Sequence, residues 1–151
     1  MNNIELGKKV KSLVHSQAYH KGYACSVEVL LQLGYLTPGA LESWRFGKTA
    51  YLERVCTTNL AILTTINKII RKTANELQLV RSFTAYHSFG KGPRRQLYFS
   101  KSGDKKIEEA YATHFVSKQR MAEIKLAKQS SMAAPPVLSL NPEVTGKVIV
   151  P

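Results

Sequence analysis

Apolar side chains recur at helical spacing through the first part of the chain. In residues 4–20, Leu6 and Val10 belong to such a stripe while lysines occupy other faces, and this pattern predicts an amphipathic helix. A strongly apolar run follows, with Ser26 as a suitable N-cap and Gly34 as a suitable C-terminal cap. We therefore expect a second, short helix between these two residues.

Two further helical patterns follow before residue 80. Thr37 and Pro38 form a typical helix start, because proline at the first helical position loses no hydrogen bond. From about residue 51 to 78 one broad apolar stripe predicts either a single long helix or two, with a new start at Asn59 capped by Thr58. The stripe consists of Leu52, Val55, Leu63, Ile66, Ile70 and Leu77.

Helical spacing gives way to alternation after residue 81. Apolar and polar residues alternate on both sides of the sequence GKGPRR at residues 90–95, which predicts a β-hairpin near residues 82–100. The odd positions, which would face a core, are Phe83, Ala85, His87, Phe89, Leu97 and Phe99. The even positions, which would face outward, are Thr84, Tyr86, Ser88, Gln96, Tyr98 and Ser100.

The C-terminal part of the sequence divides into a helix and a tail. Asp104 is a suitable N-cap for a helix that continues through Phe115 and Val116 and ends past Lys125. From residue 129 onward three prolines precede the last residue and no periodicity persists, which is typical of a flexible tail. We therefore expect a mainly α fold with one β-hairpin, in a single domain over residues 1–128, and a tail over 129–151.

The charge of the chain favours a polyanionic partner. The net charge is +12, and the segment from Leu77 to Gly103 contains five Lys or Arg and five aromatic residues but no Asp or Glu. Nucleic acid fits this composition best, an anionic membrane surface second and an acidic protein third.

No apolar run approaches the ~20 residues of a membrane span. The two cysteines have no metal-site spacing, so we expect reduced thiols in a cytoplasmic protein.

Candidate binding residues lie on the fourth helical segment, residues 59–78, and on the hairpin. Polar residues on the helix are spaced to share one face, opposite the apolar stripe. The alternative for this face is an ordinary solvated helix surface, and for the hairpin tip an ordinary soluble turn. The candidates are Lys68, Arg71, Lys72 and Asn75 on the helix, and Arg81, Tyr86, Lys91, Arg94, Arg95, Tyr98 and Lys101 on or beside the hairpin.

Catalytic and metal-binding patterns are weak. His15, His20 and Cys25 lack a recognised ligand spacing, and no nucleophile elbow or phosphate-binding loop occurs. Acidic residues near one helix start, together with a histidine, are compatible with metal-dependent cleavage, although helix capping explains them better. These residues are Asp104, Glu108, Glu109 and His114. The cluster Trp44, Arg45 and Phe46 is typical of a small core, with base stacking as the alternative.

The runs INKIIRKTANELQLV and GPRRQLYFSKSGDKKIEE lie within residues 58–112, and this stretch resembles the winged-helix domain of bacterial transcription regulators of the PadR and MarR kinds. The run INKIIRKTANELQLV is similar to the recognition helix of those families, and GPRRQLYFSKSGDKKIEE is similar to their wing and the acidic helix after it. The resemblance implies a winged-helix-like fold that binds duplex DNA. It places Lys68, Arg71 and Lys72 on the recognition helix and Gly92, Arg94, Arg95 and Tyr98 on the wing.

Three functions are compatible with these patterns. The first is a non-enzymatic duplex DNA-binding protein, such as a small transcription regulator acting as a homodimer, which uses the basic helix and the hairpin tip. The second is an RNA-binding or ribosome-associated protein. The third is a metal-dependent nuclease. For the first we expect DNA rather than RNA as the partner, and no cofactor.

Overall fold

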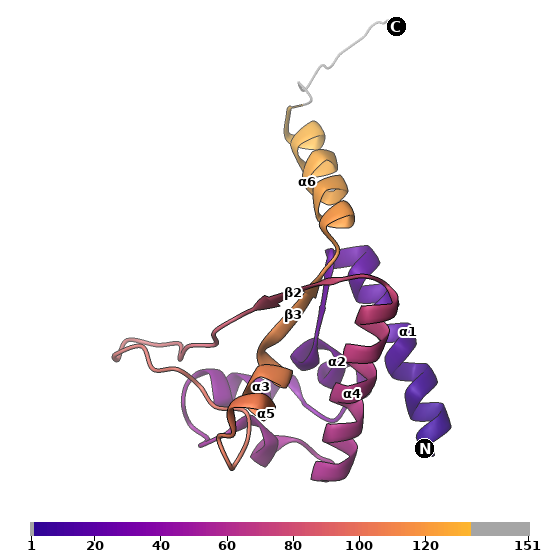
Figure 1. The fold of residues 1–151 in the computed structure, drawn as a ribbon. Coiled ribbons are helices and arrows are strands. Elements are labelled where there is room, and N and C mark those ends of the chain that lie inside the picture. Colours follow the sequence, from indigo (N-terminus) through magenta and orange to yellow (C-terminus); the bar gives the residue numbers. More distant parts are fainter. Residues whose placement is uncertain (1, 134–151) are drawn as a thin grey trace, which may run out of the picture.

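The computed structural model describes residues 2–133, with side chains through residue 130. Helices surround a small antiparallel sheet of three strands (Figure 1). In chain order the elements are α1 (Asn3–Lys21), β1 (Tyr23–Cys25), α2 (Ser26–Leu33), α3 (Pro38–Arg45), the 3-10 helix η1 (Leu52–Val55), α4 (Leu60–Glu76), β2 (Val80–Phe83), α5 (Lys105–Ala112), β3 (Thr113–Val116) and α6 (Lys118–Ala133). The mainly helical class predicted from the sequence is confirmed.

The sheet joins three distant parts of the chain. Its strand order is β1-β3-β2, so β3 lies in the centre and is antiparallel to both neighbours. Val116 of β3 pairs with Tyr23 on one side and with Val80 on the other. The predicted pairing of residues 82–89 with 96–100 is therefore wrong for β2, because its hydrogen-bonding partner is β3.

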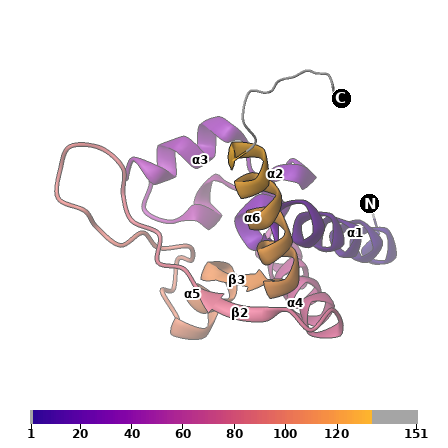
Figure 2. The same ribbon diagram turned by 90° about the horizontal axis from the view of Figure 1, so that it is seen from above.

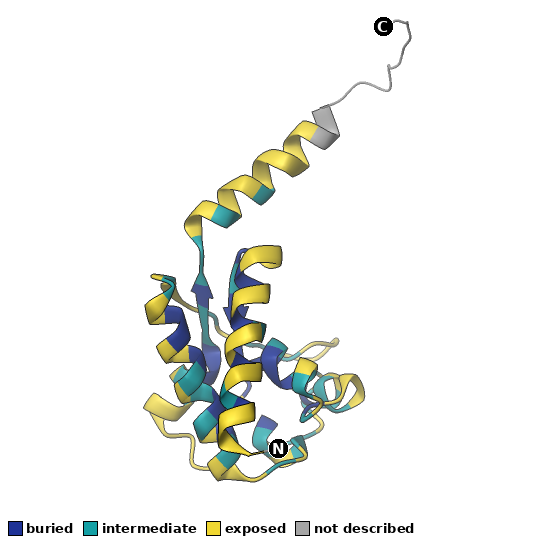
Figure 3. Ribbon diagram, turned by 90° about the vertical axis from the view of Figure 1, so that its right-hand side faces the viewer, coloured by how far each residue is buried: buried dark blue, intermediate teal, exposed yellow. Residues whose placement is uncertain are grey.

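The core lies among the helices and the sheet, and it includes the consecutive β1 residues Ala24 and Cys25. In Figures 1 and 2, α1 and α4 lie side by side, and they pack through apolar residues that include Val10 and Ile66, both fully buried. Figure 3 shows the buried residues gathered between these elements, with α6 almost entirely exposed. Burial of these side chains is the main source of stability in a domain of this size.

Most of the predicted helix starts are confirmed. Thr37 caps α3 as predicted, through the Ala40 N–H. The first helix, expected from residue 4, begins at Asn3, and its cap is Asn2, which was not predicted; the Asn2 Oδ1 accepts a hydrogen bond from the Glu5 backbone N–H at 2.8 Å. The apolar stripe after residue 51 forms two helices, η1 and α4, and the N-cap of α4 is Asn59. Asn59 therefore takes the role that the sequence suggested for Thr58.

The cap predicted at Ser26 is wrong, and the reason is a tertiary contact. Ser26 is the first residue of α2, and its hydroxyl donates to Oδ1 of Asn67 at 2.6 Å. The N-cap position belongs to Cys25, which makes no side-chain capping bond. This hydroxyl therefore joins α2 to α4.

The helix predicted after Asp104 is shorter than expected. Asp104 does cap α5, but this helix ends at Ala112 and the chain passes directly into β3. Phe115 and Val116 are therefore strand residues, since pairing with two strands outweighs their helical spacing. α6 then leads away from the sheet and includes residues 129–133 of the segment expected to be a tail. The remainder of that tail, 134–151, lies outside the described residues.

Over residues 2–133, none of the helices combines the length and the apolar character needed to cross a lipid bilayer.

Candidate nucleic-acid interface

The predicted basic face of α4 is exposed. Burial of apolar residues such as Leu63 and Ile70 fixes the rotation of the helix, and the opposite side points to solvent. We call this side the α4 face, and its residues are Lys68, Arg71, Lys72 and Asn75, all exposed. The one acidic residue of α4, Glu76, pairs with Lys11 of α1 at 3.5 Å. The cations of the α4 face are therefore not offset by acids on their own helix.

A groove of about 490 Å³ runs beside this face, between α4, β2, α5 and β3. Three exposed cations line it, one from each of three elements: Arg71 of α4, Arg81 of β2 and Lys106 of α5. One carboxylate, that of Glu109, also lines it. Within the described residues, none of these three cations belongs to an ion pair. The groove therefore has a net positive charge, and we call it the cationic groove.

The sheet register explains how β2 contributes to the groove. Because side chains of a strand alternate between faces, Arg81 and Phe83 point to the same side of β2. Their cross-strand partners in β3 are Phe115 and Thr113, respectively, and all four line the cationic groove. Phe83 is 61 % exposed, so the prediction that it faces a core is wrong. Its ring forms an apolar wall beside the cations.

Residues 84–104, which we call the basic loop, do not form the predicted hairpin strands, but the predicted antiparallel pairing is confirmed over the short stretch next to the tip. A single bridge joins His87 to Gln96, and the Leu97 N–H donates to the Tyr86 carbonyl at 2.8 Å. The tip at residues 90–95 therefore projects from the body, as Figures 1 and 2 show. Lys91 and Arg94 are exposed there.

The returning half of the basic loop is anchored to the core. Leu97 and Phe99 are buried and Tyr98 is 53 % exposed, as the alternation predicted. The indole N–H of the fully buried Trp44 donates to the Tyr98 carbonyl at 2.8 Å, so the core assignment of this tryptophan is confirmed. Ser100, which was expected to face outward, is buried because its hydroxyl donates to Glu108 at 2.6 Å.

The outgoing half of the loop is anchored to α3. The Arg45 guanidinium lies 3.8 Å from the centroid of the Phe89 ring, and the Phe89 N–H donates to the Arg45 carbonyl at 2.6 Å. Phe89 remains 51 % exposed, so its predicted burial is wrong; it packs on the surface of α3 against Arg45 and Phe46. Arg95 lies against Gly47, whose positive φ favours glycine at that close approach.

Tyr86 links the loop to the sheet and is only half-exposed. Its hydroxyl lies 2.8 Å from Nε2 of His114 in β3, and His114 stacks on Tyr23 of β1. Burial raises the pKa of Tyr86 and lowers the pKa of His114. Tyr86 was expected to face outward as a binding residue, but its ring packs against Trp44 and Phe99. Its role in this structure is to anchor the loop.

The acidic residues considered for metal-dependent cleavage have separate structural tasks. Asp104 caps α5, and the Glu108 carboxylate accepts hydrogen bonds from the Phe99 and Ser100 backbone N–H groups at 3.0 and 2.8 Å. Within residues 2–130, no three His, Cys, Asp or Glu side chains come close enough to hold a metal ion together. Glu109 remains in the cationic groove.

Both cysteines have free thiols, and burial disfavours the thiolate of each. Cys25 is buried and Cys56 is half-buried, and burial raises the pKa of Cys25 and brings that of Cys56 to about 11. Since the thiolate is the reactive form, neither environment activates a nucleophile.

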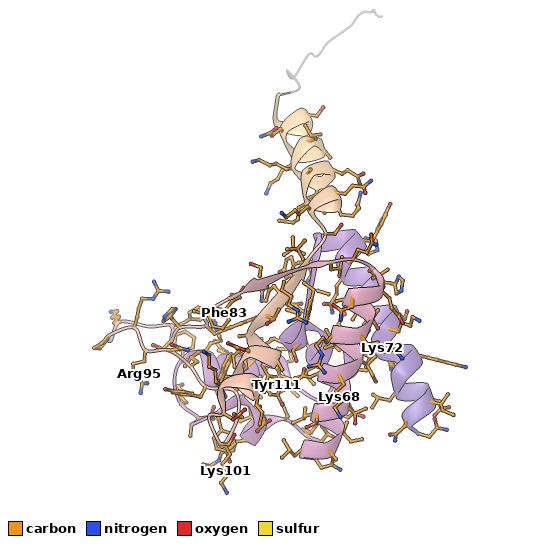
Figure 4. All side chains as sticks on the ribbon, viewed as in Figure 1. Lys68, Lys72, Phe83, Arg95, Lys101 and Tyr111 are labelled. Atoms are coloured by element: carbon orange, nitrogen blue, oxygen red, sulfur yellow. The ribbon has the colours of Figure 1, made fainter. Side chains whose placement is uncertain are left out.

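The predicted site residues fall into two regions. Arg71 and Arg81 meet in the cationic groove, next to the rest of the α4 face, whereas the loop residues lie elsewhere. In Figure 4, Lys68 and Lys72 lie on one side of the molecule, Arg95 on the other and Lys101 at the lower end. Sequence reasoning missed Lys106 and the exposed ring of Phe83. The pair Lys105–Lys106 is flanked by Asp104 and Glu108, so local charge did not indicate the first, and nothing local indicated the second.

Comparison of the chain with protein families, with curated proteins and with solved structures gave no match.

Proposed function

We propose that this protein binds duplex DNA without enzymatic activity, with the α4 face in the major groove and the tip of the basic loop against phosphates. The observation that carries the proposal is the α4 face itself: an exposed helical row of two lysines, an arginine and an asparagine with no acid on the same helix except the paired Glu76. Such donors suit both phosphate oxygens and base edges.

The dimensions of α4 fit this role. Its 17 residues span about 25 Å, and a major groove about 12 Å wide admits a helix with one exposed side. One side of α4 is buried against α1 and α2, so these two helices would support α4 from behind.

The order of elements also supports the proposal. A basic helix leads into a strand of a small antiparallel sheet, and a long basic loop departs from that strand. This order agrees with the winged-helix resemblance of residues 58–112. The loop tip carries Lys91, Arg94 and Arg95, which would contact phosphates or an adjacent minor groove.

The test is the salt dependence of binding by the full-length protein. Affinity for a random-sequence duplex is measured by fluorescence anisotropy over a series of salt concentrations, for the wild type and for the Lys68→Ala, Lys72→Ala double variant. If both lysines contact phosphates, the slope of log affinity against log salt falls by about two units, since each neutralised phosphate contributes roughly 0.9.

A charge-matched control comes from α6. Lys125 and Lys128 are exposed on this helix, which leads away from α4 (Figure 1), so replacing both with Ala should leave the slope unchanged. Equal slopes in both double variants would contradict contact through the α4 face. Tighter binding to structured RNA than to any duplex would favour the RNA-binding alternative instead.

A further inference from the structure

We propose that the cationic groove holds one unstacked nucleotide of the bound nucleic acid, with its base against Phe83 and its phosphates between Arg71, Arg81 and Lys106. The inference rests on the proposed function and specifies the ligand. This ligand is a duplex in which one strand contains an unpaired nucleotide, such as a bulge.

The size and charge of the groove suit this ligand. A volume of about 490 Å³ lies in the range of small-ligand sites, which is about 300–1,000 Å³. Three cations from α4, β2 and α5 line the groove together with one carboxylate, and none of the three belongs to an ion pair formed within the described residues. A group of negative charge is therefore the complementary occupant, and a purely apolar partner is not.

Phe83 gives the groove a second kind of recognition. Its ring is 61 % exposed although it belongs to β2, in a protein that buries Leu97 and Phe99 nearby in sequence. An aromatic face beside phosphate-binding cations is the arrangement on which bases of single strands stack. The cations alone would explain attraction of any phosphate, whereas the ring selects a phosphate that carries a planar base.

Hydrogen-bonding groups line the same groove. Asn67 is one of them, and because its Oδ1 already accepts from the Ser26 hydroxyl at 2.6 Å, its amide nitrogen is the group that it can offer a base as a donor. Glu109 supplies an acceptor from α5. A base stacked on Phe83 thus meets a donor and an acceptor, which are the groups that an unpaired base edge requires.

The experiment compares two duplexes of the same sequence, one perfect and one with a single central unpaired 2-aminopurine. The full-length protein should bind the bulged duplex about 10-fold more tightly, because stacking on an aromatic side chain contributes to affinity for each unstacked base. Binding should also change the fluorescence of the 2-aminopurine as its ring leaves the neighbouring bases and meets Phe83.

Variants of Phe83 test whether the preference for the bulged duplex comes from stacking on this ring. Phe83→Leu should bring affinity for the bulged duplex down to that for the perfect one, and Phe83→Tyr should keep the preference. Phe89→Leu is the matched control, because Phe89 is also an exposed aromatic residue but lies outside the groove. It should keep the preference between the two duplexes.

Four outcomes would overturn the inference. Equal affinity of the wild type for both duplexes would overturn it while leaving duplex binding intact, and an unchanged preference in Phe83→Leu would exclude stacking on that ring. Free dAMP that binds as tightly as the bulged duplex would make a mononucleotide the ligand. Absence of binding to either duplex would overturn the proposed function as well.

Discussion

The cationic groove and the basic loop are both positively charged, but they are built differently. The groove draws one cation from each of α4, β2 and α5, elements far apart in the sequence, and it lies beside the core. The loop takes its cations from one continuous segment, which is tied to α3, η1 and β3 at its base and projects at its tip. The density of positive charge along the sequence therefore predicted the basic loop as a candidate site. The cationic groove can be recognised only from the fold, because its cations are distant in sequence.

The same contrast applies to their aromatic residues. In the loop, Phe99 points inward and stacks on Tyr111 at 5.3 Å between ring centroids. In the groove, Phe83 points outward. One ring stabilises the fold and the other is available to a ligand, so substitutions in the two regions should affect different measurements.

The largest expected effect is on stability and comes from the inner side of the loop. Phe99→Ala should lower the free energy of unfolding by about 3–5 kcal/mol, the usual cost of removing a fully buried aromatic side chain. Phe83→Ala should change it by no more than about 0.5 kcal/mol, because the ring is mostly exposed. Urea-induced unfolding followed by circular dichroism measures both. Similar losses in the two variants would contradict the contrast between these regions.

The next largest effect is on affinity and comes from the groove. Replacing Arg71, Arg81 and Lys106 together with Ala should weaken duplex binding on the order of 100-fold near physiological salt, if each contacts a phosphate. Anisotropy titration measures this loss, and circular dichroism checks that the variant is folded. A loss no larger than that of the α6 control, Lys125→Ala with Lys128→Ala, would show that the groove does not contact the nucleic acid.

The loop tip should have a smaller effect on affinity and none on sequence preference. Arg94→Ala with Arg95→Ala should weaken binding on the order of 10-fold on all sequences and reduce the salt slope by about two units. By contrast, Asn75→Ala on the α4 face should relax discrimination between sites, since a lost base contact costs roughly 1–3 kcal/mol at the matched base. Binding selection from a random duplex pool distinguishes the two results. An unchanged slope in the loop variant would refute phosphate contact by the tip.

The smallest expected effect is a pH dependence at the junction between loop and sheet. Burial lowers the pKa of His114 from 6.5, so the unfolded chain takes up this proton at a higher pH than the folded chain does. Stability should therefore fall as the pH decreases below about 6.5, where protonation favours the unfolded state. Thermal unfolding at several pH values measures this, and His114→Asn should flatten the dependence. His15→Asn, at an exposed position on α1, should leave it unchanged.

Local signals in the sequence predicted the helices well. Capping residues such as Thr37 and Asp104 act within one turn, so their effect is visible in a few consecutive positions. The exposed row on α4 was predictable for the same reason, since the buried stripe fixes the rotation of the helix. The assignment failed at Ser26, where a contact with Asn67 of α4 replaced the local cap.

The sheet and the groove were not predictable in this way. Alternation indicates that a segment is extended, but it does not identify the strand with which that segment pairs. Phe83 alternates as expected, yet its cross-strand partner is Thr113 and not a residue of 96–100. Because the strand that pairs with β2 was predicted wrongly, the side to which Phe83 points was predicted wrongly too. For the same reason the sequence did not predict that Arg81 and Lys106 line one groove.

The sheet order has a consequence for how this chain folds. β3 is the central strand and is nearly the last part of the described chain to be synthesised, while its partner β1 follows directly after α1. Tyr23 cannot pair with Val116 until the whole intervening sequence has been synthesised. Closing so long a loop costs chain entropy, and the strand contacts that offset this cost form only afterwards. During translation α1, α2 and α4 can form early from local contacts, whereas both outer strands have to wait for β3.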